Sequence, residues 1–200
     1  MLYKIRKMRQ ISSEIHKIRD EYLVEIIKAH NKIWKNIDIN NKKEVNNAYK
    51  KISKIIIELC FECLEKIYVL LLKKLPNLFI VKENIIVDLE SLLYKEDGKN
   101  LANRLYEYYV KYKGQNAIYK LNRMLITEVE YIFSGVLYKK IDLSQYDCFI
   151  VDNLDDEISC DECPSIYTIF PIDAKKPPYH PECQCFWIPM TNEEIKRLNK

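Results

Sequence analysis

The residues of this chain best suited to chemistry are a cluster of cysteines and one histidine near the C-terminus. Cys160 and Cys163 are two residues apart, and His180, Cys183 and Cys185 follow downstream. Two thiolates with this spacing bind one ion together, and a second close-set pair completes a tetrahedral Zn²⁺ site. The spacing predicts one structural zinc ion, bound by Cys160, Cys163, His180 and either Cys183 or Cys185.

Other interpretations of the cysteine cluster stay open. Disulfides need an oxidising compartment, but the charged N-terminal segment is not typical of a secretory signal. Seven cysteines is also an odd number for a secreted disulfide framework. A thioredoxin-like redox pair is expected between a strand and a helix, whereas Pro164 follows Cys163 and no helical pattern comes after it. Cysteines without a function fit poorly, because five ligand-type residues share one short polar stretch.

Several enzyme classes lack their characteristic residues here. The chain has three glycines and neither a phosphate-binding loop nor a dinucleotide fingerprint. A catalytic zinc would need an open coordination position and a nearby base, which makes it less expected than a structural one. His16 and His30 fall on a predicted helix and are expected to be solvated or half-buried. We therefore predict no enzymatic activity and no small-molecule substrate.

The formal net charge of +3 is unevenly divided along the chain. Residues 141–185 carry a net charge of −8, residues 1–140 carry +10, and residues 186–200 carry +1. A basic helical region predicts contact with nucleic acid or with an acidic protein. A lysine-rich, solvated helix face is the alternative interpretation. No uncharged apolar run approaches the roughly 18–20 residues of a membrane span, so no membrane partner is expected.

The periodicity of the apolar residues predicts the elements that position the cysteine cluster. Steps of three and four residues predict helices over 3–34, 42–75, 84–94, 100–112 and 115–140. Apolar runs predict short strands over 146–151, 167–170 and 185–188. Cys60 and Cys63 lie inside the second helix and are predicted to be buried apolar residues. The expected fold class is α+β, with mainly long α-helices and a small C-terminal zinc-stapled β module.

The C-terminal half resembles a known family in a series of short motifs. They are Thr127-Glu128, the apolar run 149–151, Asp156 with Cys160 and Cys163, Phe170-Pro171, His180-Pro-Glu-Cys183-Gln-Cys185 and Ile188-Pro189. This pattern resembles the phage head morphogenesis family, the minor head proteins related to the F protein of phage Mu. Ile126 and Gln184 stand where the family usually has arginine, and neither departure changes a candidate ligand.

The resemblance implies a structural role in a tailed phage or prophage-like element. Such proteins are minor head components that associate with the portal and act in head assembly and in the fate of packaged DNA. Expected partners are portal or capsid proteins and, non-specifically, DNA. The expected location is the virion, in the head interior or at the portal, and the host cytoplasm, without secretion. A zinc-containing nucleic-acid-binding protein and a toxin or nuclease-like enzyme domain are the alternatives.

The predicted elements and the resemblance together divide the chain into four parts. Residues 1–95 form a helical N-terminal region, and residues 96–140 form the helical part of a minor-head-like domain. Residues 141–190 form the small Cys/His β module, and residues 191–200 form a tail.

Overall fold

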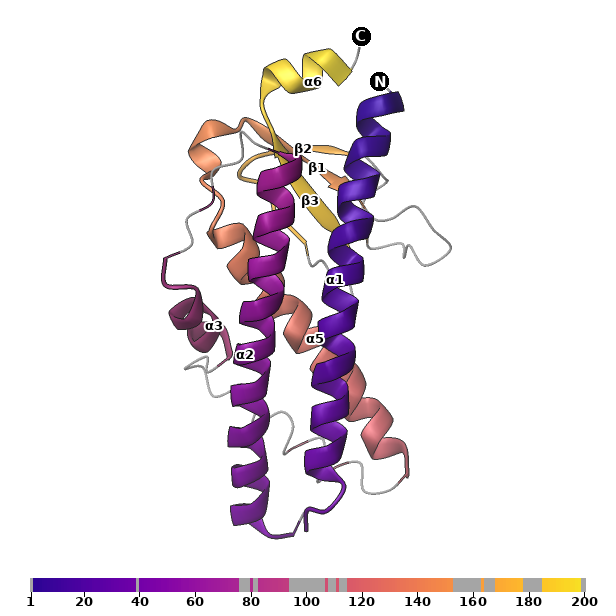
Figure 1. The fold of residues 1–200 in the computed structure, drawn as a ribbon, viewed down its shortest axis with the longest axis vertical. Helices are drawn as coiled ribbons and strands as arrows, with labels where there is room; N and C mark the ends of the chain where they lie inside the picture. Colours follow the sequence, from indigo (N-terminus) through magenta and orange to yellow (C-terminus); the bar gives the residue numbers. More distant parts are fainter. Residues whose placement is uncertain are drawn as a thin grey trace.

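The fold combines a long helical hairpin with a small antiparallel sheet (Figure 1). The computed structural model describes residues 2–38, 40–75, 80, 83–93, 107, 111, 115–152, 163, 168–177 and 185–198. Its helices are α1 (Leu2–Trp34), α2 (Lys42–Lys74), α3 (Ile85–Leu93), α5 (Gln115–Lys139) and α6 (Asn192–Leu198). A short 3₁₀ helix, η1 (Leu143–Gln145), precedes the strands β1 (Cys148–Asp152), β2 (Ile169–Pro171) and β3 (Phe186–Met190).

Helices α1 and α2 form an antiparallel hairpin that runs along the long axis of the molecule (Figure 1). The turn between them is fixed by Asn41, whose side chain accepts hydrogen bonds from the backbone N–H groups of Lys43 and Glu44. Glu44 in turn accepts from the Asn41 amide and from the backbone N–H of Asp38. These contacts satisfy N–H groups that a helix start leaves without intrahelical partners. Helix α2 ends at Lys74 and is capped by Leu75, which directly precedes Pro76, a residue that cannot continue a helix.

One hydrophobic core joins the hairpin, α3, α5 and the sheet. Its most buried side chains come from every one of these elements: Ile11, Ile15, Ile52, Ile56, Leu64, Ile67, Leu89, Leu125, Val136, Phe149 and Trp187. The predicted apolar stripes of the first two long helices are therefore confirmed where their side chains are described. Cys60 and Cys63 are each 2% exposed within this core, as predicted.

The three strands are arranged in the order β2-β1-β3, and both pairings are antiparallel. Successive residues of a strand point to opposite faces of the sheet. Phe149 and Val151 of β1 therefore face the helical core, while Cys148 and Ile150 pack with Met190 in a second cluster beneath α6. Three short strands are not stable alone, so the sheet depends on burial of both of its faces.

A cluster of charged side chains attaches α3 to the end of α5. The carboxylate of Asp88 forms ion pairs with Lys139 and Lys140. The ammonium group of Lys140 also donates a 2.6 Å hydrogen bond to the backbone carbonyl of Glu83. Since Asp88 and Lys140 are both largely buried, each needs the other to offset the cost of leaving water.

The predicted helices and strands that the structure describes are present, with bounds that agree to within two residues. The predicted helix at 100–112 lies outside the described residues, apart from residues 107 and 111, which are both helical. The coarse α+β fold class is correct. None of the described helices is long and apolar enough to cross a membrane.

Helix α6 was not predicted, because residues 191–200 were expected to form a tail. It begins with a capping box in which the backbone N–H of Thr191 donates to Glu194 and the backbone N–H of Glu194 donates to the Thr191 hydroxyl. A Thr followed three residues later by Glu is a sequence signature of a helix start. The signal was therefore present in the sequence.

The prediction that His16 and His30 are solvated or half-buried was wrong. His16 is 6% exposed and His30 is fully buried. Helix α1 contacts α5 as well as α2, so its buried face is wider than one apolar stripe. The wider face also takes in the polar side chains of Ser12 and Arg19.

Candidate metal centre

The structure brings two of the five predicted metal ligands together. The sulfur atoms of Cys163 and Cys185 lie 3.3 Å apart, although the residues are separated by 22 positions in the chain. A disulfide bond would hold the sulfur atoms at about 2.05 Å, so this pair is not one. Two thiolates on a tetrahedral zinc ion, each at about 2.3 Å from the metal, lie roughly 3.8 Å apart. The observed separation is thus close to that of two ligands on one ion.

The sheet topology explains why these two cysteines meet. Cys185 directly precedes β3, and Cys163 precedes β2 in the chain. Strands β2 and β3 lie on opposite sides of β1 and share no hydrogen bonds with each other. An ion bound by both cysteines would therefore tie together the two segments that lead into the edge strands.

Cys185 is fixed by its position next to the best-packed part of the sheet. It is 8% exposed and belongs to the same core as Trp187, which follows two residues later on the same face of the strand. Trp187 is fully buried, and its ring centroid lies 4.1 Å from that of Tyr138 on α5. The Trp187 backbone N–H also donates to the Tyr138 hydroxyl at 3.3 Å. These contacts with α5 hold the start of β3, which Cys185 directly precedes.

The other predicted ligands, Cys160, His180 and Cys183, lie outside the described residues. Within the part of the chain that the structure describes, no group of three or more His, Cys, Asp or Glu side chains is arranged to hold a metal ion. The pair of Cys163 and Cys185 fits the donor set of a structural zinc site, since thiolates are preferred zinc ligands. The pair makes Cys185 a candidate ligand, as the sequence predicted.

A second polar feature is a groove of about 920 Å³ between α1 and α2. Its polar and charged lining residues are Ser13, His16, Lys17, Asp20, Glu21, Glu25, Glu62 and Lys66. The ammonium group of Lys66 lies 4.7 Å from the centre of the Tyr22 ring. Neither ring nitrogen of His16 has a hydrogen-bond partner among the residues that the structure describes. Four carboxylates against two lysines make this groove acidic.

Burial keeps both histidines of α1 uncharged. Burial, together with the nearby positive charge of Arg19, lowers the pKa of His16 to about 3. Burial also lowers the pKa of His30 to about 4, against the smaller opposing effects of the Asn31 and Asn122 side chains. At neutral pH neither side chain is in its imidazolium form, so neither can act as a general acid. Sequence reasoning missed this property because the burial depends on α5.

These lowered pKa values predict a loss of stability in mild acid. The unfolded chain binds protons near pH 6.5, whereas the folded chain resists them until about pH 4 or below. The stabilisation is therefore complete above pH 6.5 and is lost as the pH falls toward 4. Between pH 6.5 and pH 5 the free energy of unfolding should fall by about 1.6 kcal/mol for each histidine. Denaturant titrations at several pH values would measure it.

Neutral substitutions provide the control for this prediction. His16→Phe or His30→Phe should each remove about half of the loss between pH 6.5 and pH 5, and the double variant should remove most of it. Lys17→Gln changes an exposed neighbour of His16 and should leave the pH dependence unchanged. An unaltered pH dependence in the double variant would show that other groups cause it.

Comparisons with known proteins give no relative for this arrangement. No protein-family model, no curated protein and no solved structure matches the chain. The function of the chain is therefore inferred from its own geometry and from the resemblance of its C-terminal motifs.

Proposed function

We propose that this chain is a minor head protein of a tailed phage or prophage-like element, with a structural zinc site and no catalytic role. The observation that carries the proposal is the meeting of Cys163 and Cys185 with their sulfur atoms 3.3 Å apart. These residues belong to the two separated halves of the motif on which the family resemblance rests. Their proximity supports a motif that acts as one metal-binding unit.

In this proposal Cys160, Cys163, His180 and Cys185 hold the zinc ion. When bound, zinc would supply cross-linking and no reaction chemistry, because four protein ligands leave no open position for a substrate. The chain's own residues hold the sheet in place. The Tyr138 and Trp187 rings pack one face of the sheet against α5, and α6 covers the other face of the sheet. The result is a rigid end suited to docking against another protein.

The proposed partners are portal or capsid proteins, with packaged DNA as a further, non-specific contact. The protein would act in the head interior or at the portal of the virion, and in the host cytoplasm before assembly. A structural protein of a particle needs surfaces for docking more than it needs a catalytic pocket. The long hairpin, about 50 Å for a helix of 33 residues, supplies such a surface.

Particle association tests the proposed function. Particles induced from the host should contain the chain, and it should remain with them after nuclease digestion removes accessible and released DNA. Protein sequencing of gradient-purified particles would measure this, with a host cytosolic protein as the control. Absence of the chain from particles that contain the portal protein would contradict the proposal.

A further inference from the structure

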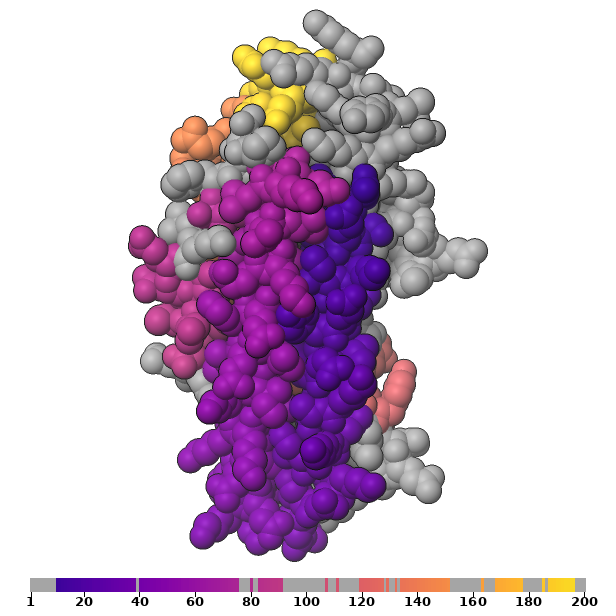
Figure 2. Space-filling view, viewed as in Figure 1, coloured from indigo at the N-terminus to yellow at the C-terminus, as the bar shows by residue number. Residues whose placement is uncertain are grey.

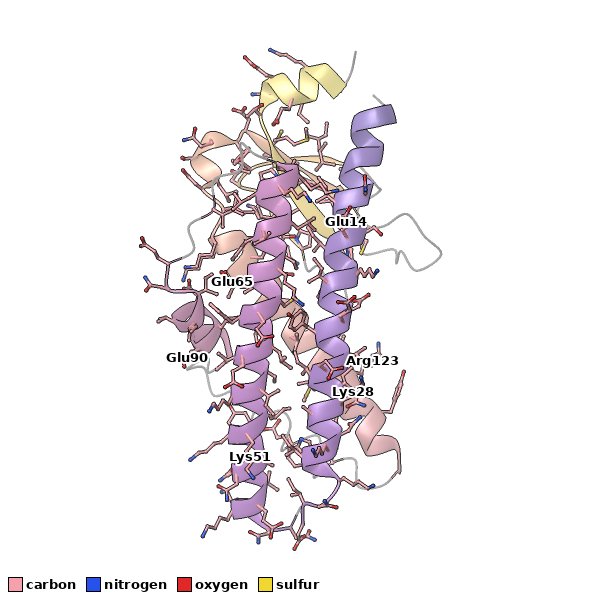
Figure 3. The ribbon with its side chains drawn as sticks, viewed as in Figure 1. Glu14, Lys28, Lys51, Glu65, Glu90 and Arg123 are labelled. Atoms are coloured by element: carbon pink, nitrogen blue, oxygen red, sulfur yellow. The ribbon has the colours of Figure 1, made fainter. Side chains whose placement is uncertain are left out.

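The charge of the helical hairpin falls into three zones along its length. At the end away from the turn, residues 2–12 and 67–74 contain six basic and no acidic residues. The hairpin tip, residues 28–54, contains eight lysines and only two acidic residues, a formal net charge of +6. The acidic waist, residues 13–25 and 55–66, contains seven acidic and three basic residues, a net charge of −4. Because α1 and α2 run antiparallel, residues distant in sequence combine within each zone. Figure 3 shows Lys28 and Lys51 nearer the turn of the hairpin and Glu14 and Glu65 nearer the sheet.

The lysines of the hairpin tip are available for a partner. All eight side chains are exposed: Lys28, Lys32, Lys35, Lys42, Lys43, Lys50, Lys51 and Lys54. Lys28 pairs with Glu25, and Lys54 pairs with Glu58. The other six have no carboxylate within ion-pair distance among the described residues. The two acidic residues of the tip, Asp38 and Glu44, accept hydrogen bonds from the turn itself.

The spacing of these lysines places them in stripes along the helices. Lys28, Lys32 and Lys35 are separated by four and three residues, so they share one side of α1 over about 10 Å. Lys43, Lys50 and Lys54 are separated by seven and four residues, so they share one side of α2 over about 16 Å. Duplex DNA carries one negative charge per roughly 1.7 Å of its axis. Each stripe can therefore face several phosphates at once.

The chemistry of the hairpin tip fits a phosphate backbone better than a protein. Specific protein interfaces need buried apolar or aromatic anchors, and none of the large exposed apolar residues that the structure describes lies between residues 28 and 54. The tip also contains no arginine, the residue that most often reads base edges. A lysine that contacts phosphate acts as a point charge, and such contacts carry no information about base sequence.

We infer that the hairpin tip is a sequence-independent binding surface for duplex DNA. The inference rests on the proposed function, which includes packaged DNA as a contact, and it assigns that contact to one end of the molecule. The tip lies at the opposite end of the long axis from the sheet (Figure 1). Figure 2 shows α1 and α2 side by side, with their turn forming this end. One end of the chain can thus contact DNA while the other docks on protein.

Matched lysine substitutions in the purified full chain test the inference. The tip variant carries Lys35→Gln, Lys43→Gln and Lys50→Gln, and the control variant carries Lys17→Gln, Lys73→Gln and Lys196→Gln. All six lysines are exposed, and both variants lose the same charge. Affinity for two labelled duplexes of unrelated sequence is measured by fluorescence anisotropy over a series of salt concentrations. Circular dichroism confirms that both variants remain folded.

Wild type should bind both duplexes equally, with an affinity that falls steeply with salt. The tip variant should lose about tenfold or more in affinity at low salt, and the slope of log K against log salt should become shallower by about 2–3. The control variant should stay within about twofold of wild type at low salt. Equal losses in the two variants, or no binding by wild type, would overturn the inference.

Particle association separates this inference from the proposed function. A tip variant that still binds DNA like wild type but no longer joins particles would assign the tip to a protein partner and overturn the inference. A chain absent from particles whose tip nevertheless binds DNA would remove the proposed function and leave the DNA surface standing.

Discussion

Replacing Cys185 with serine is expected to reduce bound zinc from one ion per chain to less than about a tenth of an ion. The sulfur atom of Cys185 lies 3.3 Å from that of Cys163, so its removal takes away one of the thiolates that the proposed ion requires. Elemental analysis of protein purified under reducing conditions, without chelator, would measure the zinc content. Thermal unfolding of the same samples should show a lower melting temperature for the variant.

Cys148→Ser is the matched control for the zinc measurement. Cys148 is also a buried cysteine on the sheet, but it packs beneath α6 on the face opposite the core. Burial raises the pKa of its thiol, and its sulfur lies 3.4 Å from the Met190 carbonyl, so it remains protonated. The control should retain one zinc ion per chain. A wild-type protein without zinc, or a Cys185→Ser variant with full zinc content, would contradict the proposed ligand set.

Trp187→Ala should destabilise the whole chain by about 3–5 kcal/mol. Trp187 is fully buried against Tyr138 of α5 and Phe149 of β1, and it belongs to the core that contains the hairpin residues. Removing the indole would leave a cavity between the sheet and the helices. For a chain of about this size the melting temperature should fall by roughly 2–4 °C per kcal/mol.

The control for the Trp187 prediction is Ile169→Ala on β2. Ile169 is 46% exposed, so its loss should change the stability by less than about 1 kcal/mol. In both variants, near-ultraviolet signals from the core and far-ultraviolet signals from the helices should melt together. If Trp187→Ala weakened only the C-terminal segment and left the helical transition unchanged, the sheet would be a separate folding unit.

The sequence by itself determined the parts of the structure that depend on neighbouring residues. Apolar residues at helical spacing predicted α1 and α2, and Pro76 marked the end of α2. Short apolar runs predicted all three strands within a few residues of their observed bounds. Local periodicity is enough for these elements because each buries a face defined by its own repeat. The missed helix α6 also had a local signal, the capping box of Thr191 and Glu194.

The sequence also identified the candidate metal-binding residues, but it could not pair them. The sequence left Cys183 and Cys185 as alternative ligands. The structure places the sulfur of Cys185 3.3 Å from that of Cys163, and Cys183 lies outside the described residues. Cys185 lies two residues before Trp187, whose ring packs against that of Tyr138 on α5, a contact between distant segments. Pairing of this kind follows from tertiary packing and has no local repeat in the sequence.

The burial of the histidines and the distribution of charge were likewise decided by the tertiary structure. The single apolar stripe of α1 predicted that His16 and His30 would be solvated or half-buried. Both are buried, because α1 contacts α5 as well as α2. The net charge of +10 in residues 1–140 appeared as one basic region, although the antiparallel hairpin sorts part of it into a basic tip and an acidic waist. The charges are sorted because the antiparallel hairpin places residues of α1 beside residues of α2 along its axis. The linear sequence does not specify which residues of the two helices become neighbours.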